Sequence, residues 1–159
     1  MWNRRLTIGA GLLLASACLT ATVPAWAADS RDQVAVRHLL MQTFDKPDAR
    51  LQVEAIAVQA EHAVASWAQG ERGGRALLRR QGQAWQIVLC AGDGLKQAAG
   101  LREAGLKPAD AQALAGRLAQ VEARLTPAQR ERYGRFEGQV RMDAQGAHPP
   151  QSHGHGHGH

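Results

Sequence analysis

Cysteine is scarce in this chain of 159 residues, which contains only Cys18 and Cys90. Cys18 lies in an N-terminal segment that we expect to be removed, so one cysteine remains and no intramolecular disulfide can form. The segment between the two ends of the chain, about residues 30–142, is long enough for one hydrophobic core. The sequence therefore predicts a single domain held together by packing and argues against a disulfide-rich scaffold.

A concentration of charge is also missing. The chain has 19 basic and 14 acidic residues and a net charge of +5. Loss of Arg4 and Arg5 with the N-terminal segment leaves 17 basic residues against 14 acidic ones, a net charge of +3. The basic residues are interspersed with acidic ones rather than massed, which argues against nucleic-acid binding.

No catalytic arrangement is visible either. The spacing of the polar residues nominates no nucleophile with a base and an orienting group, and the carboxylates form no pair on one predicted element. We therefore expect a protein that is not an enzyme.

The longest apolar run stands at the N-terminus. Arg4 and Arg5 precede an uncharged apolar stretch at residues 6–19, which is the order of segments in a secretory signal peptide. Pro24 interrupts the run, and Ala25-Trp26-Ala27 has the small-x-small pattern that precedes signal cleavage. The sequence predicts a Sec-type signal over residues 1–27, cleavage after Ala27, and a periplasmic or secreted product.

Three alternatives to this signal carry weaker support. An uncleaved anchor is disfavoured because the apolar core is shorter than the ~20 residues that span a bilayer. Lipidation at Cys18 lacks the usual leucine three residues upstream, and the arginine pair lacks the sequence typical of twin-arginine export. We expect no stable membrane insertion after cleavage.

Histidine, in contrast, is concentrated at the C-terminus. His153, His155, His157 and His159 alternate with glycine, and His148 lies just upstream. Neutral imidazole is a strong ligand for copper, nickel and zinc, and glycine lets the chain bring several rings to one ion. Because the affinity of nitrogen ligands for divalent first-row metals peaks at Cu(II), the tail predicts copper binding, with nickel or zinc as alternatives.

Residues 143–159, which follow the predicted domain and include Pro149-Pro150, are expected to form a disordered His/Gly tail. A purification handle and a low-complexity end that binds metal incidentally are the plainer interpretations. Handles are usually unbroken histidine blocks, whereas this run alternates with glycine and belongs to a chain with an export signal. The pattern favours a metal-binding function.

Residues 28–142 predict one α+β domain. Ser30 and Gln33 have the spacing of a helix-starting capping pair, and Val36, Leu40 and Phe44 then repeat every four residues. A turn is expected at residues 45–48. From residue 51 to residue 90 the apolar period shortens to two, which predicts four antiparallel strands with breaks at 59–61, 70–74 and 81–83. Helical spacing returns from Leu95 and continues, with stops at 105 and 126–127, to about residue 136. We expect the first helix to pack against a curled four-stranded sheet, followed by C-terminal helices.

Two central stretches resemble one family. WAQGERGGRALLRR at residues 67–80 and WQIVLCAGD at residues 85–93 look like bacterial copper uptake system-associated proteins. The resemblance covers most of the mature chain and includes its exported N-terminus and histidine-bearing end. It implies an accessory periplasmic protein that works beside a membrane copper transporter. Independently, a helix followed by a curled four-stranded sheet is similar to cystatin-like and nuclear-transport-factor-like folds, which often enclose a pocket.

Few residues inside the domain are candidate metal ligands. Cys90 closes a predicted apolar strand, so a buried unreactive thiol is the simpler interpretation. The functional interpretation is a Cu(I) site in which Cys90 acts with Met41, because thiolate and thioether select Cu(I). Asp93 is expected to cap the helix that begins near Leu95 rather than to bind metal.

Other singled-out residues have structural explanations at hand. His38 falls on the solvent side of its helix, and Trp67 and Trp85 are expected in the core, with a pocket role as the alternative. Arg72 and Arg75 flank a glycine pair, where we expect a solvated hairpin and weigh an anion or partner contact against it.

Overall fold

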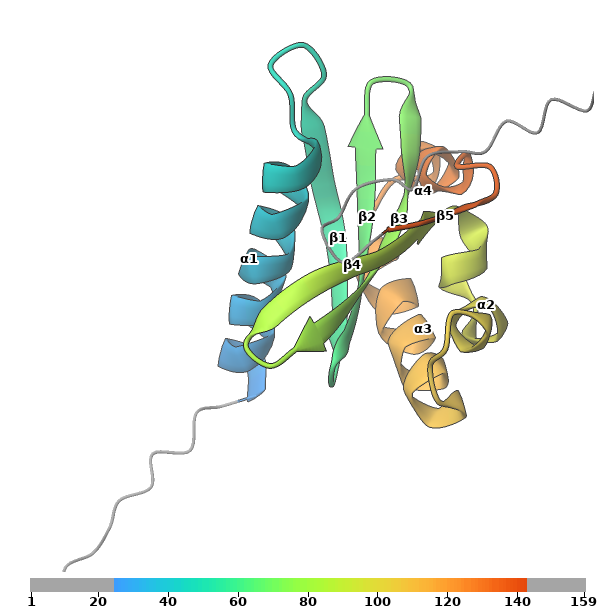
Figure 1. Ribbon diagram of the computed structural model, residues 1–159. Coiled ribbons are helices and arrows are strands. Elements are labelled where there is room, and N and C mark those ends of the chain that lie inside the picture. The colour runs from blue at the N-terminus through green and yellow to red at the C-terminus, as the bar shows by residue number, and fades with distance from the viewer. Residues whose placement is uncertain (1–24, 143–159) are drawn as a thin grey trace, which may run out of the picture.

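The fold of the chain is an open five-stranded antiparallel sheet with helices on both faces, as the computed structural model shows (Figure 1). It describes residues 25–142, with side chains from Ser30 onward. Residues 1–24 of the predicted signal segment 1–27, and all of the predicted tail 143–159, lie outside the described residues. The α+β class is confirmed.

The first helix, α1 (Ala25–Phe44), lies along one face of the sheet. Val36 and Leu40 are fully buried against the strands, and His38 is exposed as predicted. The prediction that Ser30 begins this helix is wrong, because the helix starts more than one turn earlier. Alanine is the strongest helix former, and the alanines at the start of α1 extend the helix toward the N-terminus, beyond the predicted cap at Ser30.

The sheet contains β1 (Leu51–Gln59), β2 (His62–Gln69), β3 (Arg72–Gln81), β4 (Ala84–Ala91) and β5 (Gln139–Arg141), in this spatial order. The first four strands form the predicted antiparallel meander. The prediction of four strands is wrong by one, because β5 pairs with the end of β4 after the last helix. β5 has only three residues, so the sequence contains no alternating apolar run long enough to predict this strand.

The expected loop at residues 70–74 is only partly correct. Gly70, with φ of +60°, makes the turn together with Glu71, whereas Gly73 and Gly74 belong to β3. A Cβ at Gly73 would stand 2.8 Å from the carbonyl oxygen of Arg132, and one at Gly74 would stand 2.9 Å from Cζ2 of Trp67. These glycines therefore allow close packing on both faces of a strand rather than a turn.

The remaining helical segments follow the meander: the 3-10 turn η1 (Asp93–Lys96), α2 (Ala98–Glu103), α3 (Pro108–Glu122) and α4 (Pro127–Gly134). Gly105 ends α2 with φ of +105°, which confirms the predicted stop. Thr126 begins α4 as a capping box, since its hydroxyl accepts from the amide of Gln129 and the Gln129 side chain accepts from the Thr126 amide. After α4 ends at Gly134, the chain continues into β5, which begins at Gln139.

Two hydrophobic clusters lie on opposite faces of the sheet. We call the one beneath α1 the α1 face; it includes Val36, Leu40, Val53, Ile56, Trp85, Ile87 and Cys90. The other, the α3 face, includes Ala57, Val64, Leu77, Leu89, Leu101, Leu114 and Leu118. Neighbours along one strand, such as Ile56 and Ala57, therefore face different clusters, and the centre of β1 is buried on both sides.

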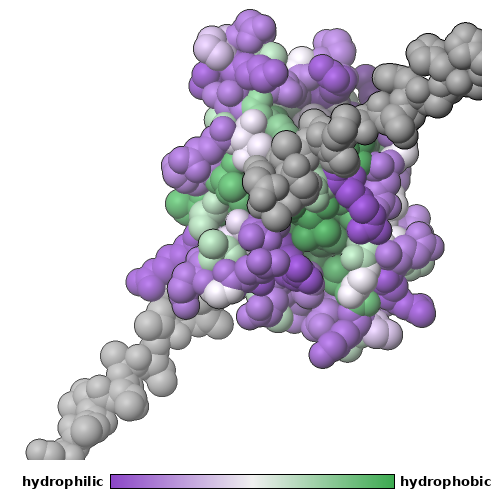
Figure 2. Space-filling model, viewed as in Figure 1, coloured by the Kyte–Doolittle hydropathy of each residue, from purple (hydrophilic) through white to green (hydrophobic). Residues whose placement is uncertain are grey.

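The outer surface is mainly hydrophilic. Figure 2 shows one view of it, with hydrophilic residues around the margin and hydrophobic residues gathered near the centre. Val34 on α1 is the large hydrophobic side chain that stands exposed among the described residues, at 67%. None of the helices within residues 25–142 combines the length and the apolar character needed to cross a bilayer.

Candidate functional site

The predicted metal ligands fall into two groups. His148, His153, His155, His157 and His159 lie outside the described residues, so the structure does not place them. Cys90 and Met41 lie inside the domain. Within residues 25–142, histidine, cysteine, aspartate and glutamate side chains form no group of three that could hold a metal ion.

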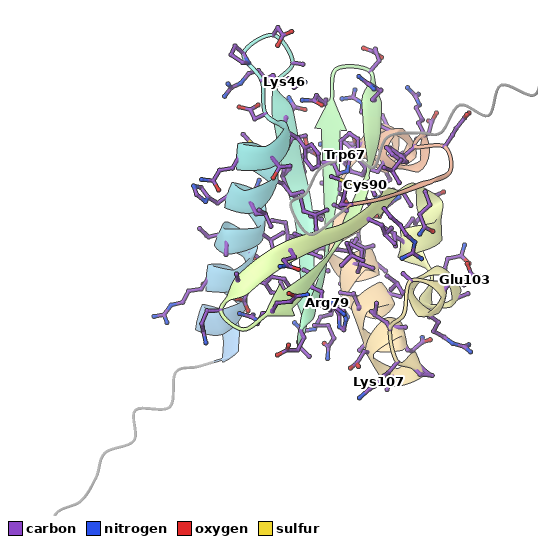
Figure 3. All side chains as sticks on the ribbon, in the orientation of Figure 1. Lys46, Trp67, Arg79, Cys90, Glu103 and Lys107 are labelled. Atoms are coloured by element: carbon purple, nitrogen blue, oxygen red, sulfur yellow. The ribbon has the colours of Figure 1, made fainter. Side chains whose placement is uncertain are left out.

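Cys90 is a free thiol near the end of β4 (Figure 3). Its side chain belongs to the α1 face and is only 4% exposed. Burial disfavours the charged thiolate and raises the pKa of Cys90 to about 12. At neutral pH the thiol is therefore protonated and unreactive, and a metal would have to displace its proton.

Two methionines pack against the same cluster as Cys90. Met41 reaches it from α1, and Met142 reaches it from the residue that follows β5. The Met142 amide donates to the Val88 carbonyl at 3.0 Å, which extends the β4–β5 ladder by one bond. Cys90 and Val140 are direct partners in that ladder, so Met142 is the diagonal neighbour of Cys90 on the same face. Met142 could not be paired with Cys90 from sequence, because the pairing depends on the unpredicted β5.

Asp93 is not the helix cap that its position suggested. The residue before η1 is Gly92, and no side chain caps that turn. Asp93 Oδ1 instead accepts from Nη1 of Arg75 at 3.0 Å and lies 3.8 Å from Nζ of Lys96. The charge of Asp93 is therefore used in an ion pair with a side chain from β3.

Arg75 also contradicts the expectation of a solvated hairpin. Its side chain is fully buried, and Nε and Nη2 donate to Oε1 and Oε2 of Glu122 at 2.7 and 3.0 Å. The Ser66 hydroxyl donates to the same Glu122 Oε1 at 2.6 Å, and Arg75 Nη1 donates to the Tyr133 carbonyl at 3.2 Å. One guanidinium thus joins β3 to α3, η1 and α4. Arg72, in contrast, is exposed at the start of β3.

A sequence signal for this network existed on α3. Leu114 and Leu118 repeat at intervals of four, and the next position of that buried stripe is Glu122. A carboxylate on an apolar stripe requires a buried cation or several donors, because an isolated buried charge is too unfavourable. The cation that pairs with Glu122 could not be named from the sequence, because Arg75 lies in β3, 47 residues earlier in the chain.

A second polar contact ties α4 to the sheet. The Tyr133 hydroxyl donates to Glu54 Oε2 at 2.6 Å, and Gln129 Nε2 donates to the same oxygen at 2.6 Å. Burial, followed by the hydrogen bond to Glu54, raises the pKa of Tyr133 above its ordinary value. These bonds fix α4, and α4 leads directly to β5 and Met142.

Three buried nitrogens among the described residues have no hydrogen-bond partner: Nε1 of Trp67, Nε1 of Trp85 and Nδ1 of His62. Trp85 is 7% exposed and carries the Arg80 guanidinium 4.5 Å from its ring centre, while Arg80 also pairs with Asp32 of α1. A buried donor without a partner is unfavourable by about 1–3 kcal/mol, so both indoles of the α1 face could donate to a further group.

His62 begins β2 and is half-buried. Desolvation lowers the pKa of its imidazole; Arg79 acts in the same direction, and Asp110 and Glu61 oppose it. The neutral ring could in principle bind metal, but no pair of further ligands stands beside it within the described region.

Comparison of the chain with protein-family models, with curated proteins and with solved structures finds no match. The interpretation of function accordingly rests on the chemistry and placement of the chain's own residues.

Proposed function

We propose that this protein is an exported, copper-binding accessory protein whose histidine tail captures or buffers Cu(II) for a membrane copper uptake system. The alternation of four histidines with glycine at residues 153–159, with His148 upstream, carries the proposal. Imidazole nitrogens without imposed geometry favour Cu(II) over the other divalent first-row metals. Nickel or zinc would use the same ligands, and the supply of metal in the compartment then decides the occupant.

The tail and the domain divide the work in this proposal. Glycine at alternate positions predicts a chain that loses conformational entropy when it wraps an ion, which keeps binding modest and exchange fast. Exchange suits a protein that hands metal on. The folded domain acts as the adaptor that docks on the transporter or on another copper-uptake component, as the resemblance to copper uptake system-associated proteins implies.

The place of action follows from the N-terminal signal. Residues 1–27 would direct the chain to the periplasm or outside the cell, where copper arrives before transport. The absence of intramolecular disulfides after processing is compatible with this location, because the two apolar clusters and the Arg75 network supply the cohesion of the domain.

A different class of function has one observation in its favour. The unpaired indole N–H groups of Trp67 and Trp85 belong to the α1 face, where a helix lies across a curled sheet. In a cystatin-like arrangement, a pocket between the helix and the sheet would accept a small apolar ligand with an acceptor oxygen, and the tail would serve storage or localisation. Such a ligand would raise the melting temperature of the domain, so a thermal-shift screen of small organic acids and amides tests this alternative.

A competitive Cu(II) titration tests the leading proposal. The chain from Ala28 to His159 is compared with a variant of equal length in which the five tail histidines are replaced by serine. We expect the wild-type chain to compete with a chelator of known affinity and the serine variant to lose at least tenfold in affinity. Equal affinity of the two proteins would overturn the tail as the capture site.

A further inference from the structure

Two sulfur-bearing side chains, Cys90 and Met142, pack on the α1 face, and Met142 is the last residue before the predicted tail 143–159. The direct ladder partner of Cys90 is Val140, and Met142 lies two residues further along the same strand direction. Diagonal neighbours of this kind have Cα atoms about 7–8 Å apart, within reach of long side chains on the same face. Cys90 and Met142 both pack into the cluster beneath α1, which confirms that they share a face.

The Arg75 network keeps this arrangement in place. It holds α4 against β3 through the Tyr133 carbonyl, and the Tyr133 hydroxyl bonds to Glu54 of β1. Phe136, which follows α4, packs edge-on against Trp67 with ring centres 5.8 Å apart. These contacts hold the segment before β5 on both faces of the sheet. Met142, which follows β5, therefore lies beside β4, the strand that carries Cys90.

We propose that Cys90 and Met142 form a second metal site, which binds Cu(I) on the α1 face. The inference rests on the proposed copper function and adds to it an oxidation state and a second location. A thiolate with a thioether is a soft ligand pair that selects Cu(I), whereas the imidazoles of the tail suit Cu(II). The surrounding apolar side chains restrict access of water to the ion.

The binding step is a ligand exchange without oxidation or reduction. The Cys90 sulfur forms a bond to Cu(I) and its proton passes to solvent, while the Met142 thioether donates an electron pair and loses nothing. The metal must therefore arrive as Cu(I). The Cys90 side chain is buried, which also keeps it from forming a disulfide with a second chain in an oxidising compartment.

The position of the site relative to the tail gives it a role. His148 stands six residues after Met142, a distance that an extended chain covers within ~20 Å. Tethering on this scale raises the effective concentration of one set of ligands around the other to about the millimolar range. Cu(I) that leaves the Cys90–Met142 site would therefore meet the imidazoles of the tail at this concentration. Cu(II) held by the tail does not enter the site directly, because that transfer requires a one-electron reductant.

The shared preference of thiolate and thioether for Cu(I) paired Cys90 with Met41 in the sequence, and the register of β5 favours Met142 instead. This difference supplies a matched control, because both methionines pack against the same cluster but only Met142 is a ladder neighbour of Cys90. Val140→Ala supplies a second control, since Val140 lies directly opposite Cys90 and has no sulfur.

The test uses the chain from Ala28 to His159 with the five tail histidines replaced by serine, so that the tail cannot mask the domain. Cu(I) is titrated under anaerobic conditions against a colorimetric Cu(I) chelator. We expect one ion per chain, a loss of at least 100-fold in affinity with Cys90→Ser and of about tenfold with Met142→Leu. Met41→Leu and Val140→Ala should stay within twofold of the parent.

Several results would overturn the proposal. They are an absence of Cu(I) binding in the histidine-free parent, unchanged affinity in Met142→Leu, or an equal loss in Met41→Leu. Met142 is only partly buried, so Met142→Leu keeps the test valid even if Cys90→Ser fails to fold. X-ray absorption should show sulfur neighbours around the bound ion, and a shell of nitrogen or oxygen alone would contradict the assignment. The Cu(II) titration of the tail is a separate measurement, so failure of the capture proposal and failure of this site are distinguishable.

Discussion

Arg75 and Glu122 form a two-pronged ion pair that is shielded from water on both sides. Nε and Nη2 of Arg75 lie 2.7 and 3.0 Å from the two carboxylate oxygens, and the side chains are 0% and 3% exposed. Ser66, Asp93 and the Tyr133 carbonyl complete the hydrogen bonding of the pair. Because each member arrives from a different element, the pair joins the meander to the helices that follow it.

Removal of one partner of this pair should destabilise the domain strongly. Arg75→Leu leaves the Glu122 charge buried without its cation, and breaking such a pair destabilises a protein by about 3–5 kcal/mol. Chemical denaturation followed by tryptophan fluorescence measures the change. Arg135→Ala is the matched control, because Arg135 pairs with Glu131 at the surface, and its effect should stay within about 0.5 kcal/mol. A loss below 1 kcal/mol in Arg75→Leu would show that the pair contributes little.

Gly74 is required by packing rather than by a turn. Its missing side chain leaves room for the Trp67 ring, which a Cβ would approach to 2.9 Å, and for Phe136 at 3.1 Å. Gly74→Ala should therefore destabilise the domain by about 1–3 kcal/mol and shift the Trp67 emission. Gly116→Ala is the opposite case, since α3 has open space at that position; this change should stabilise by about 0.5–1 kcal/mol. Equal effects of the two substitutions would contradict the packing argument.

The sequence predicted the elements that local periodicity encodes. Val36 and Leu40 identified the buried side of α1, and the alternating stretches identified β1 to β4. β5 is not predicted, because three residues carry too little pattern. A glycine pair is typical of a loop, and the neighbours that require Gly73 and Gly74, in α4 and at Phe136, lie far along the chain. Long-range contacts of this kind leave no local signal.

In the candidate site too, local patterns were predictable from the sequence and long-range contacts were not. The place of Cys90 in an apolar strand predicted a buried thiol, and that burial is confirmed. Its role as a Cu(I) ligand stays a prediction. Its neighbour Met142 depends on the register of β5, and the role of Arg75 depends on Glu122 from a distant helix. Aspartate at a helix start is typical of a cap, but Asp93 Oδ1 accepts from the buried guanidinium of Arg75, and no side chain caps the short η1 turn.

Without metal, Cys90 should react slowly with alkylating reagents. Its pKa of about 12 leaves roughly one thiolate in ten thousand thiols at pH 8, and burial limits access further. The rate of iodoacetamide labelling should rise about tenfold per pH unit from pH 7 to pH 10, since the thiolate fraction is still far from saturation. The same protein in denaturant is the control and should label fast at pH 8. Rapid labelling of the folded protein at pH 7 would contradict the buried, protonated thiol.

Cu(II) and a soft monovalent ion should affect the melting temperature differently. A ligand raises stability only if it binds the folded state better than the unfolded one, by roughly 2.7 kcal/mol at a hundredfold excess over its dissociation constant. The tail histidines stand outside the folded core in our proposal, so Cu(II) should leave the melting temperature of the full chain within about 1 °C. Ag(I), an air-stable substitute for Cu(I), should raise it by several degrees through Cys90 and Met142, and Met142→Leu should reduce that rise. If Ag(I) still raises the melting temperature of Cys90→Ala, the soft ion binds elsewhere. If Cu(II) raises the melting temperature strongly, the Cu(II) ligands lie within the fold, because stabilisation requires ligands that folding brings together.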